Sequence, residues 1–311
     1  MKWILKHKIV ILKFVVSLFF IGFIGYKIDF QVAFNSLGQI NIGILSIPIF
    51  IFALRNYLAA WRLKIILSIT SFKTEINDLT KDYFISFFLN LFLPTSVGGD
   101  VSRGFYLTNY GVDKKNAVSA IVLERFLGLS VIFLFPSFLL LTFGNYPQEL
   151  APYCEFILAT SALMILSTIL LFTGATPYLL EVISRILPVK ISELTSKTYN
   201  TIKPYGISKG QLTKAFILSF LFQGAGIYAT HLIINSVIDL PFIVSSIIIC
   251  ILLVVTILPI SVGGFGVREG TFIYLMSLVN VPEETSLLIS ILMVMHLLIQ
   301  GCFGAILYLS K

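Results

Sequence analysis

Two arginines, Arg103 and Arg268, lie near the ends of two Pro/Gly-rich strings in an otherwise apolar chain. The first string begins at Leu93 and reads LPTSVGGDVSRG, and the second begins at Leu258 and reads LPISVGGFGVREG. A guanidinium group matches a phosphate or another oxyanion through two parallel hydrogen bonds. The two strings therefore point to anion binding.

Proline and paired glycines prevent a helix from continuing through either string. A new helix is expected to begin after each glycine pair, and its free N–H groups and positive dipole end would then face the middle of the bilayer. Such a helix start is a ready binding site for an anion. We predict that both strings contribute to one central substrate site through Ser96, Gly98, Gly99, Arg103, Ser261, Gly263, Gly264 and Arg268.

Other ionisable residues lie within or beside apolar segments, where such residues are rare and are mostly functional. The predicted substrate-binding set therefore also includes Asp100, Glu124, Arg125 and Glu269. The same residues could instead form structural ion pairs, such as Asp100 with Arg103, three residues apart on one helical face. Both roles remain open at this point.

Arg55 and Arg62 lie toward the inner end of a long apolar segment. We predict that they line a cytoplasmic entrance to the central site. The alternative is that their long side chains extend to the membrane interface and have no contact with a substrate.

The composition requires a membrane. Hydrophobic residues make up 57% of the 311-residue chain and charged residues 12%, against roughly 45–50% and about 25% in soluble domains. Long continuous apolar runs favour helices over a β-barrel. We predict one all-α polytopic domain over residues 1–311, and we expect no nucleic-acid partner despite the net charge of +7.

The apolar segments divide into complete spans and interrupted ones. Six are long enough to cross the bilayer: 9–28, 40–69, 117–143, 153–173, 212–235 and 286–309. Two others, 82–110 and 242–280, contain the Pro/Gly strings. The strings recur with a constant offset of 165 residues, from Arg103 to Arg268, which indicates an internal repeat.

Lys and Arg gather in the segments 2–13, 62–81, 103–115 and 185–214. Because cytoplasmic connections carry an excess of Lys and Arg, we assign these segments to the cytoplasm. This pattern predicts that both termini are cytoplasmic and that each interrupted segment is re-entrant. Repeat 1, about 40–143, and repeat 2, about 212–309, would then have opposite orientations, as in many transporters. The connection 174–211 is predicted to hold a basic amphipathic helix on the inner membrane surface.

Enzyme motifs are absent from the sequence. It has no G-x-x-x-x-G-K-[ST] loop for ATP, no H-E-x-x-H zinc helix and no D-x-D of a metal-dependent sugar transferase. We therefore predict no cofactor, no metal site and no catalytic residue. A transporter is favoured over an enzyme.

The two Pro/Gly strings, VLERFLG at 122–128 and the Trp61-Arg62 pair together resemble the transmembrane domain of lysylphosphatidylglycerol synthases. The resemblance extends over about 9–309. It implies a flippase-type domain in a prokaryotic cytoplasmic membrane, with a membrane lipid as its partner. The chain ends at Lys311, directly after its last span, so we do not carry over the synthase activity of a soluble domain.

The expected function is translocation of an anionic or phosphate-bearing lipid of the phospholipid, aminoacyl-phospholipid or polyprenyl-phosphate type. One alternative is a membrane-embedded lipid-headgroup transferase, similar to a phosphatidylglycerol lysyltransferase, with Glu124 as base. Another is an accessory subunit that has a lipid-synthesis enzyme as its partner.

Overall fold

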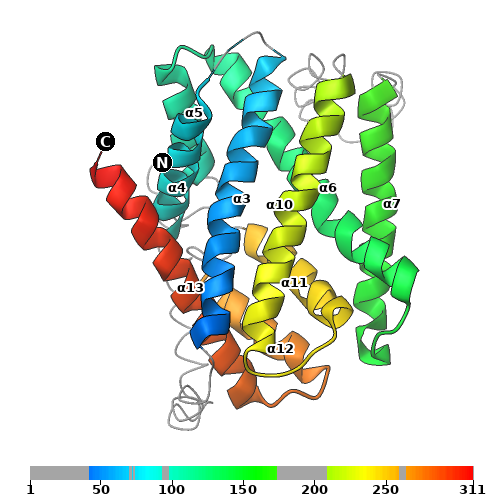
Figure 1. The fold of residues 1–311 in the computed structure, drawn as a ribbon. Helices are drawn as coiled ribbons and strands as arrows, with labels where there is room; N and C mark the ends of the chain where they lie inside the picture. The colour runs from blue at the N-terminus through cyan, green and yellow to red at the C-terminus, as the bar shows by residue number, and fades with distance from the viewer. Residues whose placement is uncertain are drawn as a thin grey trace, which may run out of the picture.

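The computed structural model describes residues 42–69, 72, 74–92, 98–173, 209–258 and 264–310. No strand occurs within these ranges, so the predicted all-helical class is confirmed for them (Figure 1). The helices are α3 (Ile42–Ser68), α4 (Ile76–Phe92), α5 (Gly98–Asn109), α6 (Lys114–Phe143), the 3-10 turn η1 (Gln148–Leu150), α7 (Ala151–Thr173), α10 (Lys209–Asn235), α11 (Phe242–Ile257), α12 (Val267–Ser277) and α13 (Glu283–Leu309).

Several helices are long and apolar enough to cross a membrane. They are Lys114–Phe143, Gln148–Leu170, Lys209–Asn235 and Glu283–Leu309. Helix α3 is also long, at 27 residues, or about 40 Å at 1.5 Å per residue. It carries charged side chains within its length, among them Arg55 and Arg62. These helices make the chain a multi-pass membrane protein.

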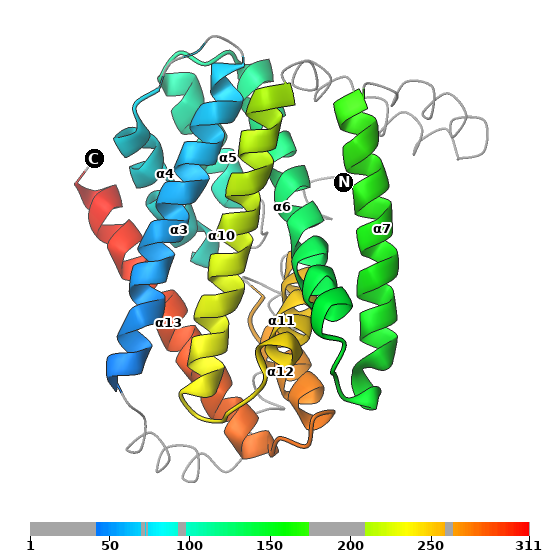
Figure 2. The same ribbon diagram turned by 45° about the vertical axis from the view of Figure 1, so that its right-hand side comes forward.

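Both Pro/Gly strings interrupt a helix, as their composition predicts. Helix α4 ends at Phe92 and α5 begins at Gly98, whereas α11 ends at Ile257 and α12 begins at Val267. The α4–α5 pair lies in the upper half of the molecule and the α11–α12 pair in the lower half (Figures 1 and 2). Each pair is too short to run the full height of the bundle.

Helices α3 and α10 lie side by side and run in opposite directions through the centre of the bundle (Figures 1 and 2). One apolar cluster surrounds α11, where Ile247 and Ile248 are fully buried. A second apolar cluster joins α3, α4, α5, α6 and α10. The polar side chains described below belong mainly to the helices of this second cluster.

Some sequence predictions lie outside the described residues. They concern the span 9–28, nearly all of the amphipathic connection 174–211, and the string members Ser96, Ser261 and Gly263.

Helix α13 packs closely on α4 at Gly304, and this contact gives a testable prediction. A methyl group at this position would lie 2.7 Å from Phe88 Cβ and nearer still to the backbone carbonyl of Phe84. Because backbone cannot move aside cheaply, Gly304→Ala should lower the free energy of unfolding by about 1–3 kcal/mol. The measurement is unfolding of the purified protein in detergent.

Gly210→Ala is the matched control, since no described residue lies within 4 Å of the methyl group that it adds. This variant should unfold at the same denaturant concentration as the natural protein, or at a slightly higher one. Equal stability of the Gly304→Ala and Gly210→Ala variants would contradict the close α4–α13 packing.

Candidate functional site: a buried arginine cavity

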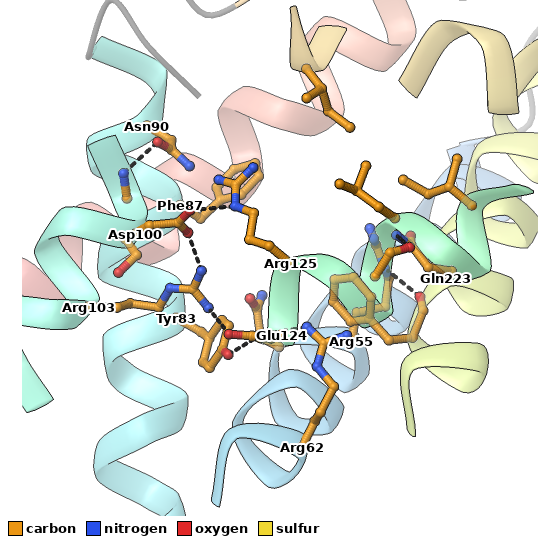
Figure 3. A pocket seen from close by; sticks show the side chains of 18 of the residues that line it. Arg55, Arg62, Tyr83, Phe87, Asn90, Asp100, Arg103, Glu124, Arg125 and Gln223 are labelled. Carbon is orange, nitrogen blue, oxygen red and sulfur yellow. Dashed lines mark hydrogen bonds and ion pairs between the residues drawn. The ribbon is translucent and has the colours of Figure 1, made fainter. Parts of the chain in front are cut away.

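A cavity of about 290 Å³, which we call the arginine cavity, lies among α3, α4, α5, α6 and α10, with Ile257 of α11 also at its wall. Figure 3 shows the side chains that line it. Six of these are charged: Arg55, Arg62, Arg103, Arg125, Asp100 and Glu124. Among the described residues that line the cavity, four cations and two anions leave an excess of two positive charges. A cavity of this kind attracts an anion.

Glu124 on α6 lies at the centre of the charged cluster. Its Oε1 accepts hydrogen bonds from Arg62 Nη2 and from the hydroxyl of Tyr83, and its Oε2 accepts one from Arg103 Nη1 at 2.9 Å. Residue Glu124 is only 3% exposed. A buried carboxylate requires such partners, because removal from water otherwise favours its neutral form. Glu124 thus joins α3, α4, α5 and α6.

Asp100, in the first turn of α5, extends the network. One of its carboxylate oxygens pairs with Arg103 on the same helix, and the other pairs with Arg125 on α6 (Figure 3). The resulting chain of alternating charges runs from Arg62 through Glu124, Arg103 and Asp100 to Arg125. Four predicted substrate-binding residues therefore meet in one place.

Arg62 is a constituent of this network and not a surface residue. It is 4% exposed, and its Nη1 donates a hydrogen bond to Ser219 Oγ on α10 at 3.0 Å. The alternative that the Arg62 side chain extends to the membrane interface is therefore wrong. The ion pair with Glu124 holds the guanidinium inside the bundle.

Arg55 also lines the cavity, but its contacts differ in kind. Its Nε donates to the backbone carbonyl of Phe222 at 3.0 Å, and its guanidinium lies over the Phe222 ring at 4.3 Å. Among the described residues, no carboxylate lies within ion-pair distance of Arg55. Gly226 gives this guanidinium its space, since a methyl group there would lie 2.5 Å from Arg55 Cζ.

The first turn of α5 contributes backbone to the site. Gly99 lines the cavity, and its N–H donates to Asn90 Oδ1 at 2.6 Å. A side chain at Gly99 would collide with Asn90 and with the carbonyl of Ser86, so the second glycine of the string is required for close packing. Gly98 begins the helix directly before it.

The second string has a different environment. Arg268 pairs with the adjacent Glu269 and lies over the ring of Phe265 at 5.4 Å. Neither Arg268 nor Glu269 lines the cavity that contains Arg103. Gly264 has φ +80°, a backbone conformation that favours glycine. Binding of one substrate by both Arg103 and Arg268 stays a prediction.

Several polar residues of the cavity were not predicted from the sequence, among them Tyr83, Asn90 and Gln223. Arg103 stacks on the Tyr83 ring at 4.4 Å, and Gln223 donates to the carbonyl of Gly128 at 3.2 Å. The sequence offered one usable signal, because Tyr83 and Asn90 stand seven residues apart and so share a face of α4.

Comparison with protein families gives a match over residues 10–301, to the family described as "Lysylphosphatidylglycerol synthase TM region". The match covers nearly the whole chain. A comparison with curated proteins gives no match.

Proposed function

The chain belongs to the lysylphosphatidylglycerol synthase TM region family, and we propose that it is a flippase-like transporter of a phosphate-bearing lipid. The family provides a lipid context for the substrate. The lipid would be a phospholipid, an aminoacyl-phospholipid or a polyprenyl phosphate, and the site of action the cytoplasmic membrane.

The observation that carries this proposal is the excess of positive charge among the described side chains that line the arginine cavity. A charged headgroup inside the bilayer is costly unless protein charges surround it. The cavity offers four guanidinium groups, each able to donate two hydrogen bonds to a phosphate. Arg55 adds a cation that no described carboxylate pairs.

The alternating charges also suggest how the headgroup could be bound and then released. A phosphate has the same kind of acceptor oxygens as the carboxylates of Asp100 and Glu124, so it can take the place of a carboxylate on an arginine. Exchange of one anion for another leaves no arginine unpaired, which keeps binding reversible. The sequence has no nucleotide motif, so movement would follow a concentration gradient or be coupled to ions or membrane potential.

A headgroup transferase is the second candidate, with Glu124 as the base that activates an attacking group. A general base needs a free oxygen within hydrogen-bond reach of the proton that it removes. Arg62, Tyr83 and Arg103 already donate three hydrogen bonds to the Glu124 carboxylate, which leaves roughly one of its acceptor positions for that proton. This arrangement supports transport over transfer. An accessory subunit, in turn, would have no substrate that needs a charged cavity.

The test uses the purified protein in proteoliposomes that contain a trace of headgroup-labelled phosphatidylglycerol. We expect the label to equilibrate between the leaflets faster than in protein-free vesicles, while mass spectrometry finds the lipid unchanged. A new lipid mass would identify a transferase. Equal rates with and without the protein, for phospholipid and polyprenyl phosphate alike, would refute transport.

We further propose an inverted repeat within one domain, with repeat 1 at about 40–143 and repeat 2 at about 212–309. The architecture would comprise six spans and two re-entrant helix pairs, α4–α5 and α11–α12, with both termini in the cytoplasm. The positions of these pairs in opposite halves of the bundle support the proposal (Figures 1 and 2). The distribution of Lys and Arg supports it as well.

This topology predicts that Lys115 faces the cytoplasm and Glu284 the outside. Both residues are exposed, at the first turns of α6 and α13. Single cysteines would replace them in a Cys302→Ser background, since Cys302 is exposed whereas Cys154 and Cys250 are buried. An impermeant thiol reagent on intact cells should label only the cysteine at position 284, and lysis should expose the other. Equal labelling of both in intact cells would contradict the topology.

A further inference from the structure

A second hollow, which we call the α5–α6 groove, lies beside the arginine cavity. It has a volume of about 900 Å³, within the range of roughly 300–1,000 Å³ that small-molecule sites occupy. Its wall is mainly apolar and includes Val101 and Phe105 of α5 and Val118 and Val122 of α6. Three of these side chains are largely exposed, at 68% for Val101, 62% for Phe105 and 48% for Val118.

The groove and the cavity have two lining residues in common, Asp100 and Arg125. The ion pair between them therefore stands at the boundary of an apolar space and a charged one. Arg125 is the more exposed partner, with 34% of its side chain accessible against 9% for Asp100. At the other end, Thr108 and Lys114 also line the groove.

A lipid needs both kinds of space at once. Its phosphate is stable at membrane depth only beside polar or charged groups, whereas its hydrocarbon chain gains nothing by leaving an apolar environment. The arginine cavity meets the first requirement and the α5–α6 groove meets the second. The two spaces join at Arg125, a cation suited to the phosphate.

We propose that the α5–α6 groove is the lateral portal for the lipid, holding its hydrocarbon chain while the phosphate binds in the arginine cavity. This inference rests on the proposed lipid-transport function. The occupant is the acyl or isoprenoid chain of a phosphate-bearing lipid. The shared residues Asp100 and Arg125 and the basic groups at both ends of the groove, Arg125 and Lys114, support this choice.

The Asp100–Arg125 ion pair is the gate of this portal. When a phosphate reaches Arg125, it replaces one oxygen of Asp100. The other oxygen of Asp100 keeps its pairing with Arg103, so the carboxylate is not left as an isolated buried charge. Opening therefore exchanges one ion pair for another and keeps both cations neutralised.

A labelling experiment tests occupancy directly. The protein is reconstituted with phosphatidic acid or with diacylglycerol, each with the same photoactivatable group in its acyl chain, and labelled peptides are mapped by mass spectrometry. We expect phosphatidic acid to label the peptides around Phe105 and Val118 several-fold more than diacylglycerol does. Both lipids should label the exposed face of α7 around Leu163 and Leu166 equally.

Two results would overturn the portal. Equal labelling of the groove by both lipids would mean ordinary contact with the surrounding bilayer. No labelling by either lipid would mean that another part of the chain fills the groove. In contrast, preferential labelling that disappears in the Arg125→Gln variant would establish the role of the cation at the boundary.

Blocking variants separate the portal from the transport function itself. Val118→Trp should fill the groove and slow lipid movement at least tenfold, while Leu166→Trp on α7, a similarly exposed position, should leave it unchanged. Gly104→Val blocks the groove from α5 in case the tryptophan disturbs folding, since the one described atom that a methyl group at Gly104 would meet is Ile121 Cδ1, at 3.5 Å.

If the natural protein moves lipid and both blocked variants move it equally fast, the portal is wrong and the transport function stands. If neither the natural protein nor any variant moves lipid, but labelling of the groove still depends on the phosphate, the lipid-binding portal stands and the transport function is wrong. Binding of soluble glycerol 3-phosphate should be unaffected by Val118→Trp, because this ligand has no chain to place.

Discussion

Glu124→Gln is expected to lower the free energy of unfolding by about 3–5 kcal/mol, the usual consequence of removing one member of a buried ion pair. Glutamine has nearly the same shape as glutamate, so packing is preserved and the change is one of charge. The natural carboxylate is 3% exposed and accepts hydrogen bonds from Arg62, Tyr83 and Arg103. Its loss leaves Arg62 buried with no described carboxylate partner. The measurement is unfolding in detergent with circular dichroism.

A double variant distinguishes this explanation from a general loss of packing. In Arg62→Gln/Glu124→Gln, the cation is removed together with its anion, so part of the stability should return. Tyr83→Phe is the milder control, because it removes one hydroxyl and should lower stability by about 1 kcal/mol. If the double variant loses more free energy of unfolding than the two single variants lose together, Glu124 is not the electrostatic centre of the bundle.

The breaks in the helices could be predicted from the sequence because their cause is local. Pro94 prevents a continuous helix at that point, whatever surrounds it, whereas the Gly98-Gly99 pair, which was expected to precede the new helix, forms its first turn. The observed helices accordingly end at Phe92 and begin again at Gly98. Of the six predicted spans, 117–143, 153–173, 212–235 and 286–309 correspond to helices that are long and apolar enough to cross a membrane, since length and hydropathy alone decide that property.

The pairing within the cavity could be predicted only in part. Asp100 and Arg103 were a natural pair because three residues separate them on one helix. The contact of Arg62 with Glu124 joins residues 62 positions apart, and nothing in either neighbourhood indicates it. Such a contact depends on how α3 packs against α6. For the same reason, the sequence predicted Arg62 at an entrance and did not predict its ion pair with Glu124 inside the charged network.

The repeated strings predicted one central site for Arg103 and Arg268, and the structure gives the two arginines different neighbours. The position equivalent to Asp100 in the second string is Phe265. Arg103 therefore has a carboxylate three residues away, whereas Arg268 has an aromatic ring there and pairs with its neighbour Glu269.

Arg55→Ala is expected to slow lipid movement at least about 30-fold, since loss of a desolvated charge contact with a phosphate costs on the order of 2 kcal/mol or more. Arg55 is the natural candidate for the first contact with an anion. Its described partners are a backbone carbonyl and an aromatic ring, so no described anion has to leave before a phosphate binds. The measurement is the proteoliposome assay with headgroup-labelled phosphatidylglycerol.

Stability should change little in the Arg55→Ala variant, which separates Arg55 from the Glu124 network. The variant loses one hydrogen bond, about 1 kcal/mol, and a contact with the Phe222 ring of about 0.5–1 kcal/mol. It also removes a positive charge from a cavity that already has an excess of them. These effects oppose each other, so the unfolding midpoint should stay close to that of the natural protein.

Two further variants and a control make the assignment specific to the guanidinium and its position. Arg55→Lys keeps the charge but loses the planar fork, so it should restore the rate only in part. Gly226→Ala leaves Arg55 in the sequence but occupies its space, and it should slow movement as well. Lys64→Ala, a cation on the same helix outside the cavity, should have no effect.

The combination of rate and stability decides the role of Arg55. A slow Arg55→Ala protein with a normal unfolding midpoint, imitated by Gly226→Ala, requires a guanidinium that acts on the substrate. Movement at the natural rate would show that the phosphate is held by Arg62, Arg103 or Arg125 alone. A marked loss of stability would place Arg55 among the structural charges, because a cation that binds a ligand contributes little to folding in the ligand's absence.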